Sequence, residues 1–241
     1  MSGHSKWKNI MHKKEKTDAQ RAKTFTKIGK EIAIAVKAGG PDPVSNSKLR
    51  DLISKAKASN VPNDNIERVI KKAASSESEN YEEVVYEGYG PSGIAVIVVA
   101  TTDNRNRTSS DLRHYFDKFG GNLGTTGCVS FMFSDKGVII VDPENVDEDK
   151  LMEDALEAGA DDIKFEDEVY VVTTDTNAVY DVKDALEKAG YKIVSAQEDK
   201  IPASTVTLTN EDDIIKMNKL LDMLDENDDV QDVYHNWENN E

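Results

Sequence analysis

The amino-acid sequence predicts an α+β protein of three domains, and three observations support this prediction. Apolar residues recur at helical spacing before residue 75. After a polar linker at 75–80 the period changes to two, with short apolar runs that are typical of strands. Further along, strands and helices follow one another in the order β-α-β-β-α-β, which is the order of a ferredoxin-like domain. We therefore expect an N-terminal three-helix domain followed by two ferredoxin-like α/β domains, one inserted into the other.

The first domain is predicted from three amphipathic segments within residues 1–76. The first runs from Ala22 to Val36 and stops at the helix-breaking sequence Gly39-Gly40-Pro41. The second covers 49–56, and the third covers 66–73. Each segment has one apolar stripe, so the three can bury their stripes against each other in a small bundle.

Beyond the linker, strands are expected at 84–87, 94–100 and 129–133, with a helix between the last two. The glycines of segment 88–93 match G-x-G-x-x-G. Dinucleotide binding requires such glycines to open a helix, and here a strand follows them. This segment is therefore interpreted as a hairpin turn.

Residues 137–200 contain a complete β-α-β-β-α-β set, and 204–237 contain strand, helix and strand. The units at 93–133 and 204–237 are each too small to bury one face of a sheet, so we expect them to combine. The predicted domains are 1–76, then 81–136 with 201–241 as a split domain, and 137–200 inserted within it. The alternative is one continuous sheet, which is less favoured because the two sets close separately.

The charge is distributed unevenly, although the formal net charge is -16. Residues 1–76 contain 17 Lys/Arg and 7 Asp/Glu, whereas 77–241 contain 13 Lys/Arg and 39 Asp/Glu. An asymmetry of this size indicates that the basic domain meets an anionic partner, of which nucleic acid is the obvious class. The alternative is a lysine-rich helical domain whose charges are simply solvated.

Several classes of protein find no support in the sequence. The single cysteine, Cys128, excludes a disulfide framework within the chain, and no stretch is apolar enough to span a membrane. The four histidines lack metal-ligand spacing, and no nucleophile elbow or phosphate-binding loop is present. We expect no catalytic residues, no enzymatic activity, no metal, no cofactor, no small-molecule substrate and a cytoplasmic location.

The first candidate nucleic-acid contact is the N-terminal arm, where cations are interleaved with one aromatic residue. Lysine and arginine neutralise phosphates, and an aromatic ring can stack on a base. For Trp7 a structural role on the bundle is equally compatible with the sequence. The candidate residues are Lys6, Trp7, Lys8, Lys13, Lys14, Lys16, Arg21, Lys23 and Lys27.

The second candidate is the pair Arg105 and Arg107, which lie at the predicted start of a helix. Free N–H groups at a helix N-terminus and nearby guanidinium groups can bind an anion. The alternative is that Asp103 caps this helix while the arginines pair with neighbouring carboxylates. Phe131 and Phe133 could suggest base stacking, but both sheets are too acidic for phosphate, so these aromatics are expected in the core.

The motifs of this chain resemble those of the YebC family, which includes PmpR-like proteins and mitochondrial translational activators. They are Gly3-His4-Ser5-Lys6-Trp7, Thr24-Phe25-Thr26-Lys27, Gly39-Gly40-Pro41-Asp42-Pro43, Pro62-Asn63-Asp64-Asn65-Ile66-Glu67-Arg68, Tyr86-Glu87-Gly88-Tyr89-Gly90-Pro91, Thr102-Asp103-Asn104-Arg105-Asn106-Arg107-Thr108 and Gly120-Gly121-Asn122-Leu123-Gly124. The resemblance implies three domains, a cytoplasmic location and no catalysis.

The resemblance also implies a regulator of gene expression, usually described as a DNA-binding transcriptional regulator. The alternative is a ribosome-associated translation factor that binds ribosomal RNA or tRNA and relieves stalling on proline-rich stretches. The charge count is compatible with both, and no recognition helix or dimer seam is visible in the sequence. The nucleic acid could therefore be DNA or RNA.

Overall fold

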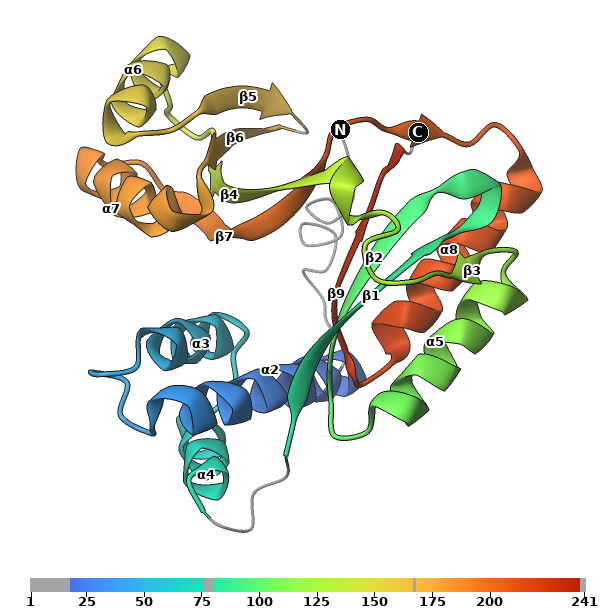
Figure 1. Cartoon of the computed structure of the whole chain (residues 1–241). Coiled ribbons are helices and arrows are strands. Elements are labelled where there is room, and N and C mark those ends of the chain that lie inside the picture. Colours follow the sequence, from blue (N-terminus) through green and yellow to red (C-terminus); the bar gives the residue numbers. More distant parts are fainter. Residues whose placement is uncertain (1–17, 76–79, 167, 239–241) are drawn as a thin grey trace. The chain divides into compact units, whose positions relative to one another are not determined.

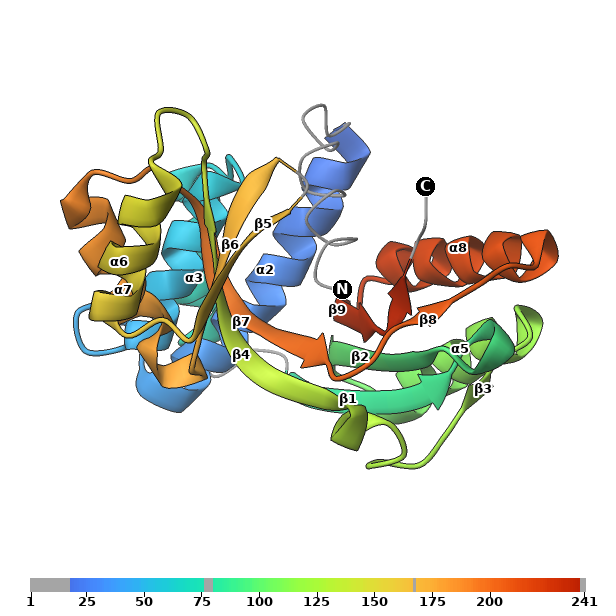
Figure 2. The ribbon, with the colours of Figure 1, turned by 90° about the horizontal axis from the view of Figure 1, so that it is seen from above.

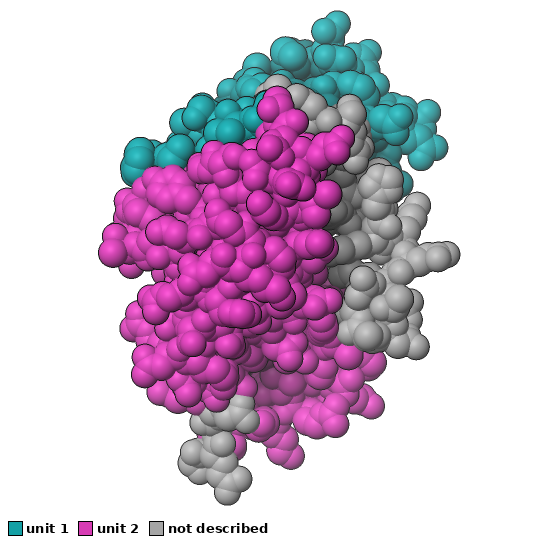
Figure 3. Space-filling model, turned by 90° about the vertical axis from the view of Figure 1, so that its right-hand side faces the viewer, with its two compact units in different colours: residues 1–12, 131–207, 236–241 teal, residues 13–130, 208–235 magenta. Residues whose placement is uncertain are grey.

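The computed structural model describes residues 18–75, 80–166 and 168–238. These residues form two compact units, which Figure 3 colours separately. One unit contains residues 18–130 and Leu208–His235, and the other contains Phe131–Thr207 and 236–238. Within the described part of the chain, no helix has the length and apolar character that crossing a membrane requires.

Three helices form the N-terminal bundle, as the apolar spacing predicts (Figure 1). They are α2 (Asp18–Gly39), α3 (Ser47–Ala58) and α4 (Asn63–Ala73). Their apolar stripes meet in one core that includes Ile32, Leu49 and Ile66. Because the stripes face inward, the lysines and arginines at the intervening positions of α3 and α4 are exposed.

The first sheet has the strand order β3-β1-β2-β9 and is antiparallel throughout. Its strands are β1 (Glu82–Tyr89), β2 (Ala95–Thr102), β3 (Asn122–Leu123) and β9 (Val230–His235). Helices α5 (Arg105–Lys118) and α8 (Glu211–Glu226) lie side by side along it (Figure 1). β1 and β2 form an antiparallel hairpin through η2 (Pro91–Gly93), so the predicted turn in the glycine-rich segment is confirmed.

The predicted strand at 129–133 was wrong. This segment contains the 3-10 turn η3 (Ser130–Met132), and β3 is the strand that follows α5. The buried carboxylate of Glu87 accepts hydrogen bonds of 2.8 Å from the N–H groups of Gly127, Val129 and Ser130. These N–H groups are therefore bound to a side chain instead of a neighbouring strand.

The expectation that Phe131 and Phe133 belong to the core was also wrong. The Phe131 side chain is 77% exposed, and Phe133 is only partly buried. Phe131 lies in the turn next to the N–H groups that bind Glu87, so the alternation of a strand does not apply to it. Without that alternation, the position of an aromatic residue in the sequence does not predict that its side chain points into the core.

The second sheet has the strand order β5-β6-β4-β7 and lies between β3 and α8 in the sequence (Figure 2). Its strands are β4 (Phe133–Val141), β5 (Asp162–Glu166), β6 (Val169–Thr174) and β7 (Ile193–Pro202). Its helices are α6 (Glu148–Ala158) and α7 (Val179–Ala189). The chain order is β-α-β-β-α-β, as predicted. The fold class, a three-helix region followed by antiparallel α/β sheets, is thus confirmed.

The connections around the first sheet differ from the prediction. The segment expected as a strand at 205–208 contributes only β8 (Val206–Thr207), which pairs in parallel with β10 (Trp237–Glu238) in a separate two-stranded sheet. The first sheet therefore takes three strands from 82–123 and one, β9, from the C-terminal segment. The exact domain boundaries 81–136 with 201–241 and 137–200 stay a prediction.

Candidate nucleic-acid interface

Most of the predicted N-terminal contacts lie outside the described residues: Lys6, Trp7, Lys8, Lys13, Lys14 and Lys16. Arg21 belongs to α2, but its side chain is not among the described ones, and Lys23 is a half-buried residue of the same helix. These assignments remain predictions.

The Lys27 side chain contacts the C-terminal end of α8. Its Nζ donates to the carbonyl oxygen of Asp225 at 2.9 Å and lies 3.6 Å from the Asp225 carboxylate. The Lys27 side chain is only 14% exposed. A phosphate would have to displace these acceptors before it could bind Lys27.

Exposed cations of α3 and α4 form a set that the sequence analysis did not single out. Lys48, Arg50 and Lys57 on α3 and Lys71 on α4 are exposed and form no ion pair with any residue that the structure describes. The sequence could have identified these residues as exposed cations, because they occupy the polar positions of amphipathic helices in the basic domain. Unpaired surface cations are available to phosphate without first breaking a contact.

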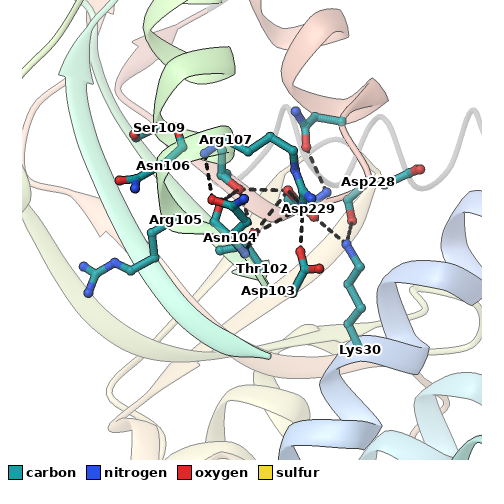
Figure 4. Close-up of polar contacts among 12 residues, drawn as sticks. Lys30, Thr102, Asp103, Asn104, Arg105, Asn106, Arg107, Ser109, Asp228 and Asp229 are labelled. Carbon is teal, nitrogen blue, oxygen red and sulfur yellow. Dashed lines mark hydrogen bonds and ion pairs between the residues drawn. The ribbon is translucent and has the colours of Figure 1, made fainter. Parts of the chain in front are cut away.

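Asp229, which directly precedes β9, binds one cation from α2 and one from α5 (Figure 4). One carboxylate oxygen lies 2.6 Å from Lys30 Nζ, and the other lies 2.9 Å from Arg107 Nη2. The second oxygen also accepts the Thr108 hydroxyl at 2.8 Å. We call Lys30, Arg107, Thr108 and Asp229 the Asp229 cluster; it joins α2 to α5 and to the start of β9.

Local structure places three members of the Asp229 cluster. The Asn104 side chain caps α5 by accepting the Arg107 N–H at 3.1 Å, so Arg107 and Thr108 fall in the first turn of the helix. The Asn227 side chain accepts the Asp229 N–H at 2.8 Å and fixes the turn before β9. The cap is therefore Asn104, and not Asp103 as the alternative interpretation expected.

The surroundings of Asp229 and of Arg107 favour the ionised form of each side chain. Burial by itself would raise the pKa of the Asp229 carboxyl. Hydrogen bonds from Lys30, Arg107 and Thr108 lower this pKa by more than burial raises it, so the net shift is downward. Hydrogen bonds from Arg107 to Asp229 and Asp103 raise the pKa of the guanidinium above its already high value. Arg107 therefore stays charged and is bound to carboxylates.

Arg105 and Arg107, which the sequence placed together, have different surroundings. The Arg105 side chain points away from the Asp229 cluster in Figure 4 and is 62% exposed. Among the described residues, its guanidinium has one ion-pair partner, the Glu82 carboxylate at a distance of 3.7 Å. Arg105 is thus open to solvent, whereas Arg107 donates to Asp103 at 2.8 Å as well as to Asp229.

A shallow hollow of about 400 Å³ lies beside the Asp229 cluster. It is lined by Thr26, Lys30, Tyr81, Asp103, Arg107, Asp111, Asn227, Asp228 and Asp229. Four carboxylates face two cations, so the hollow repels phosphate. In the described ranges there is also no group of three or more His, Cys, Asp or Glu side chains that could hold a metal ion.

A basic three-helix bundle is followed by two four-stranded antiparallel sheets, of which one interrupts the other in the sequence. This arrangement defines an α+β protein with a basic helical region and acidic sheet regions. The chain belongs to the TACO1/YebC family. Residues 5–76 match the TACO1/YebC protein N-terminal domain, and residues 81–237 match the TACO1/YebC second and third domain.

Relatives of high similarity carry the name of regulators. A probable transcriptional regulatory protein from Acetivibrio thermocellus is 62% identical over 239 residues, covering 98% of this chain and 99% of the relative. Another of that name, from Caldicellulosiruptor saccharolyticus, is 56% identical over 243 residues, covering 100% of both chains. The crystal structure of a conserved hypothetical protein from Aquifex aeolicus matches with a TM-score of 0.82 and 50% identity over 92% of each chain.

Proposed function

We propose that this protein is a nucleic-acid-binding regulator of gene expression, and specifically a DNA-binding transcriptional regulator whose helical bundle contacts the phosphate backbone. The observation that carries the proposal is the set of exposed, unpaired cations on α3 and α4. The names of the relatives support regulation of transcription.

The physical basis is the release of counterions from nucleic acid. A lysine or arginine that meets a phosphate displaces a condensed cation into solution, and binding gains the entropy of that release. The bundle can do this because its region has an excess of cations, whereas residues 77–241 have 39 acidic against 13 basic residues. The orientation of the bound nucleic acid would then follow from repulsion by the acidic sheets.

Other cations have graded roles in this proposal. Arg105 is a secondary phosphate contact because it is exposed and held by one distant carboxylate. Arg107 is bound to Asp229 and Asp103 and has a structural role. The arm residues from Lys6 to Lys23 extend the contact along the backbone. No step of this function requires catalysis, and a cytoplasmic location is part of the proposal.

The test compares two triple variants with the same change in charge. One is Lys48→Ala, Arg50→Ala and Lys57→Ala on α3. The other is Lys150→Ala, Lys188→Ala and Lys219→Ala, three exposed lysines of the helices beside the sheets. Binding to a labelled duplex DNA is measured by fluorescence anisotropy at several salt concentrations. The α3 variant should flatten the dependence of log K on log salt by up to about 2.7, since each lost contact removes about 0.9.

The control variant should leave the slope unchanged. Equal loss in both variants would show that only overall charge matters, and no loss in either would contradict the role of the bundle. Melting temperatures of all variants verify that they are folded.

The acidity of the sheets supports a second candidate, a translation factor that binds RNA on the ribosome. Two acidic sheets fit poorly along a rod of duplex phosphates, but they could face away from ribosomal RNA while the bundle contacts it. Co-sedimentation with ribosomes at physiological salt, alongside binding to promoter and random DNA, separates the two. Selective promoter binding without ribosome association supports the transcriptional function, and the reverse pattern supports the translational one.

A further inference from the structure

The segment between α2 and α3 is a loop with a single, well-defined shape. The buried side chain of Asn46 donates to the carbonyl oxygens of Ala35 and Gly40, each at 2.8 Å. Its oxygen accepts the Leu49 N–H at 3.0 Å and so caps α3. One buried amide thus ties together the end of α2, the loop and the start of α3.

The tip of the loop is held by bonds of its own. The Asp42 carboxylate accepts the Val44 N–H at 2.9 Å, and the Asp42 carbonyl accepts the Asn46 N–H at 2.9 Å. A Cβ on Gly39 would lie 2.8 Å from the Asn46 amide nitrogen, and Gly40 has a φ of +85°. The observed loop conformation therefore requires glycine at both positions.

This rigid loop displays apolar side chains to solvent. Val44 is 83% exposed, more than any other large hydrophobic residue in the described part of the chain. Pro41 is exposed and Pro43 partly buried. The Val44 side chain contributes almost nothing to the core, although the chain fixes its position with several hydrogen bonds. A fixed position is of use when the side chain must meet something outside the chain.

Two unpaired cations follow this tip at the start of α3. Lys48 and Arg50 are four and six residues beyond Val44, and both are exposed without an ion pair to a described residue. Apolar contacts alone would fit many partners. Apolar side chains beside unpaired cations fit a polymer that has apolar base faces and anionic phosphates.

We propose that Pro41, Pro43 and Val44 form a preformed apolar wedge that packs against unpaired bases of a single-stranded nucleic acid. Lys48 and Arg50 contact the flanking phosphates, while the exposed Asp42 carboxylate stays bound to the Val44 N–H. The proposal rests on the broader part of the proposed function, nucleic-acid binding by the basic bundle, and adds to the phosphate contacts a contact with bases. The wedge suits unpaired bases since packing between them does not require a base pair to open. Its rigidity reduces the conformational entropy lost on binding.

The test uses the full chain and oligonucleotides that carry 2-aminopurine, a base whose fluorescence rises when it is unstacked. Single-stranded RNA, single-stranded DNA of the same sequence and a DNA duplex are compared. The variant is Val44→Ser. The matched control is Val194→Ser, which changes a valine that is 44% exposed in the acidic second sheet. Both variants should keep the wild-type melting temperature, because neither valine is buried.

Val44→Ser is expected to weaken single-strand binding about 3- to 10-fold, to abolish the rise in 2-aminopurine fluorescence and to keep the salt dependence. Lys48→Ala with Arg50→Ala should flatten the salt dependence. The RNA and DNA arms identify which strand the wedge accepts.

Unchanged affinity and fluorescence in Val44→Ser, with salt-dependent binding intact, would overturn the wedge and leave the proposed function standing. Failure of the wild type to bind any of the probes would overturn both. Equal losses in Val44→Ser and Val194→Ser would also contradict a specific wedge.

Discussion

The cations of α3 and those of the Asp229 cluster lie in the same compact unit but have opposite surroundings. Lys48, Arg50 and Lys57 face solvent without a described ion pair, whereas Lys30 and Arg107 share one buried carboxylate. A count of charges treats these five residues alike. The comparison shows that a cation's partners, more than its place in a basic or acidic segment, decide whether it is available to phosphate.

The largest expected effect tests the structural side of this comparison. Asp229→Ala removes the shared acceptor and leaves Lys30 and Arg107 without their buried counter-charge. Breaking such a pair costs about 3 to 5 kcal/mol, so the free energy of unfolding should fall by about 3 kcal/mol. Urea denaturation measures this change. Asp225→Ala, at an exposed carboxylate near Lys27, is the control and should change stability by less than about 1 kcal/mol.

Acid should weaken the Asp229 cluster without any mutation. The folded-state pKa of Asp229 lies below its ordinary value, so its contribution is complete above the unfolded pKa, about 3.9. The contribution is lost as the pH falls through the lower, folded pKa. The loss should be smaller than in Asp229→Ala because the protonated carboxyl keeps its shape.

Denaturation curves between pH 2 and pH 6 test this expectation. Glu87, whose pKa is also lowered despite burial because three N–H groups bind its carboxylate, titrates in the same window. Asp229→Asn isolates the share of Asp229, since it should reduce the pH dependence while that of Glu87 remains. A variant with the same pH dependence as the wild type would contradict the assignment.

The smallest effects separate the two neighbouring arginines. Arg107→Ala should lower the free energy of unfolding by about 1 to 2 kcal/mol, because Asp229 keeps Lys30 and Thr108 as partners. Arg105→Ala should change stability by less than about 0.5 kcal/mol and weaken nucleic-acid binding slightly. Thermal melts and anisotropy measure both. If Arg107→Ala reduces binding at unchanged stability, the structural role of Arg107 is wrong.

The sequence alone determined the local elements and the distribution of charge. Helical spacing located α2, α3 and α4, and the strand that follows the glycine-rich segment identified a hairpin turn. Such patterns can be recognised in the sequence because neighbouring residues determine the local backbone conformation, and that conformation determines on which face each side chain lies. The contrast between a basic N-terminal segment and an acidic remainder was also evident from the sequence, since it requires only a count of charged residues along the chain.

Tertiary structure decided which charged groups meet and which apolar groups stay outside. Lys30 and Asp229 are separated by 199 residues, and no local sequence pattern predicts their contact. In the segment 129–133, where a strand was expected, the N–H groups of Val129 and Ser130 donate to a distant carboxylate, that of Glu87, and the chain forms a turn. Contacts of this kind depend on how sheets and helices pack in three dimensions. The spacing of apolar and polar residues predicts which face of a helix or strand a side chain lies on, but not which distant residue it contacts.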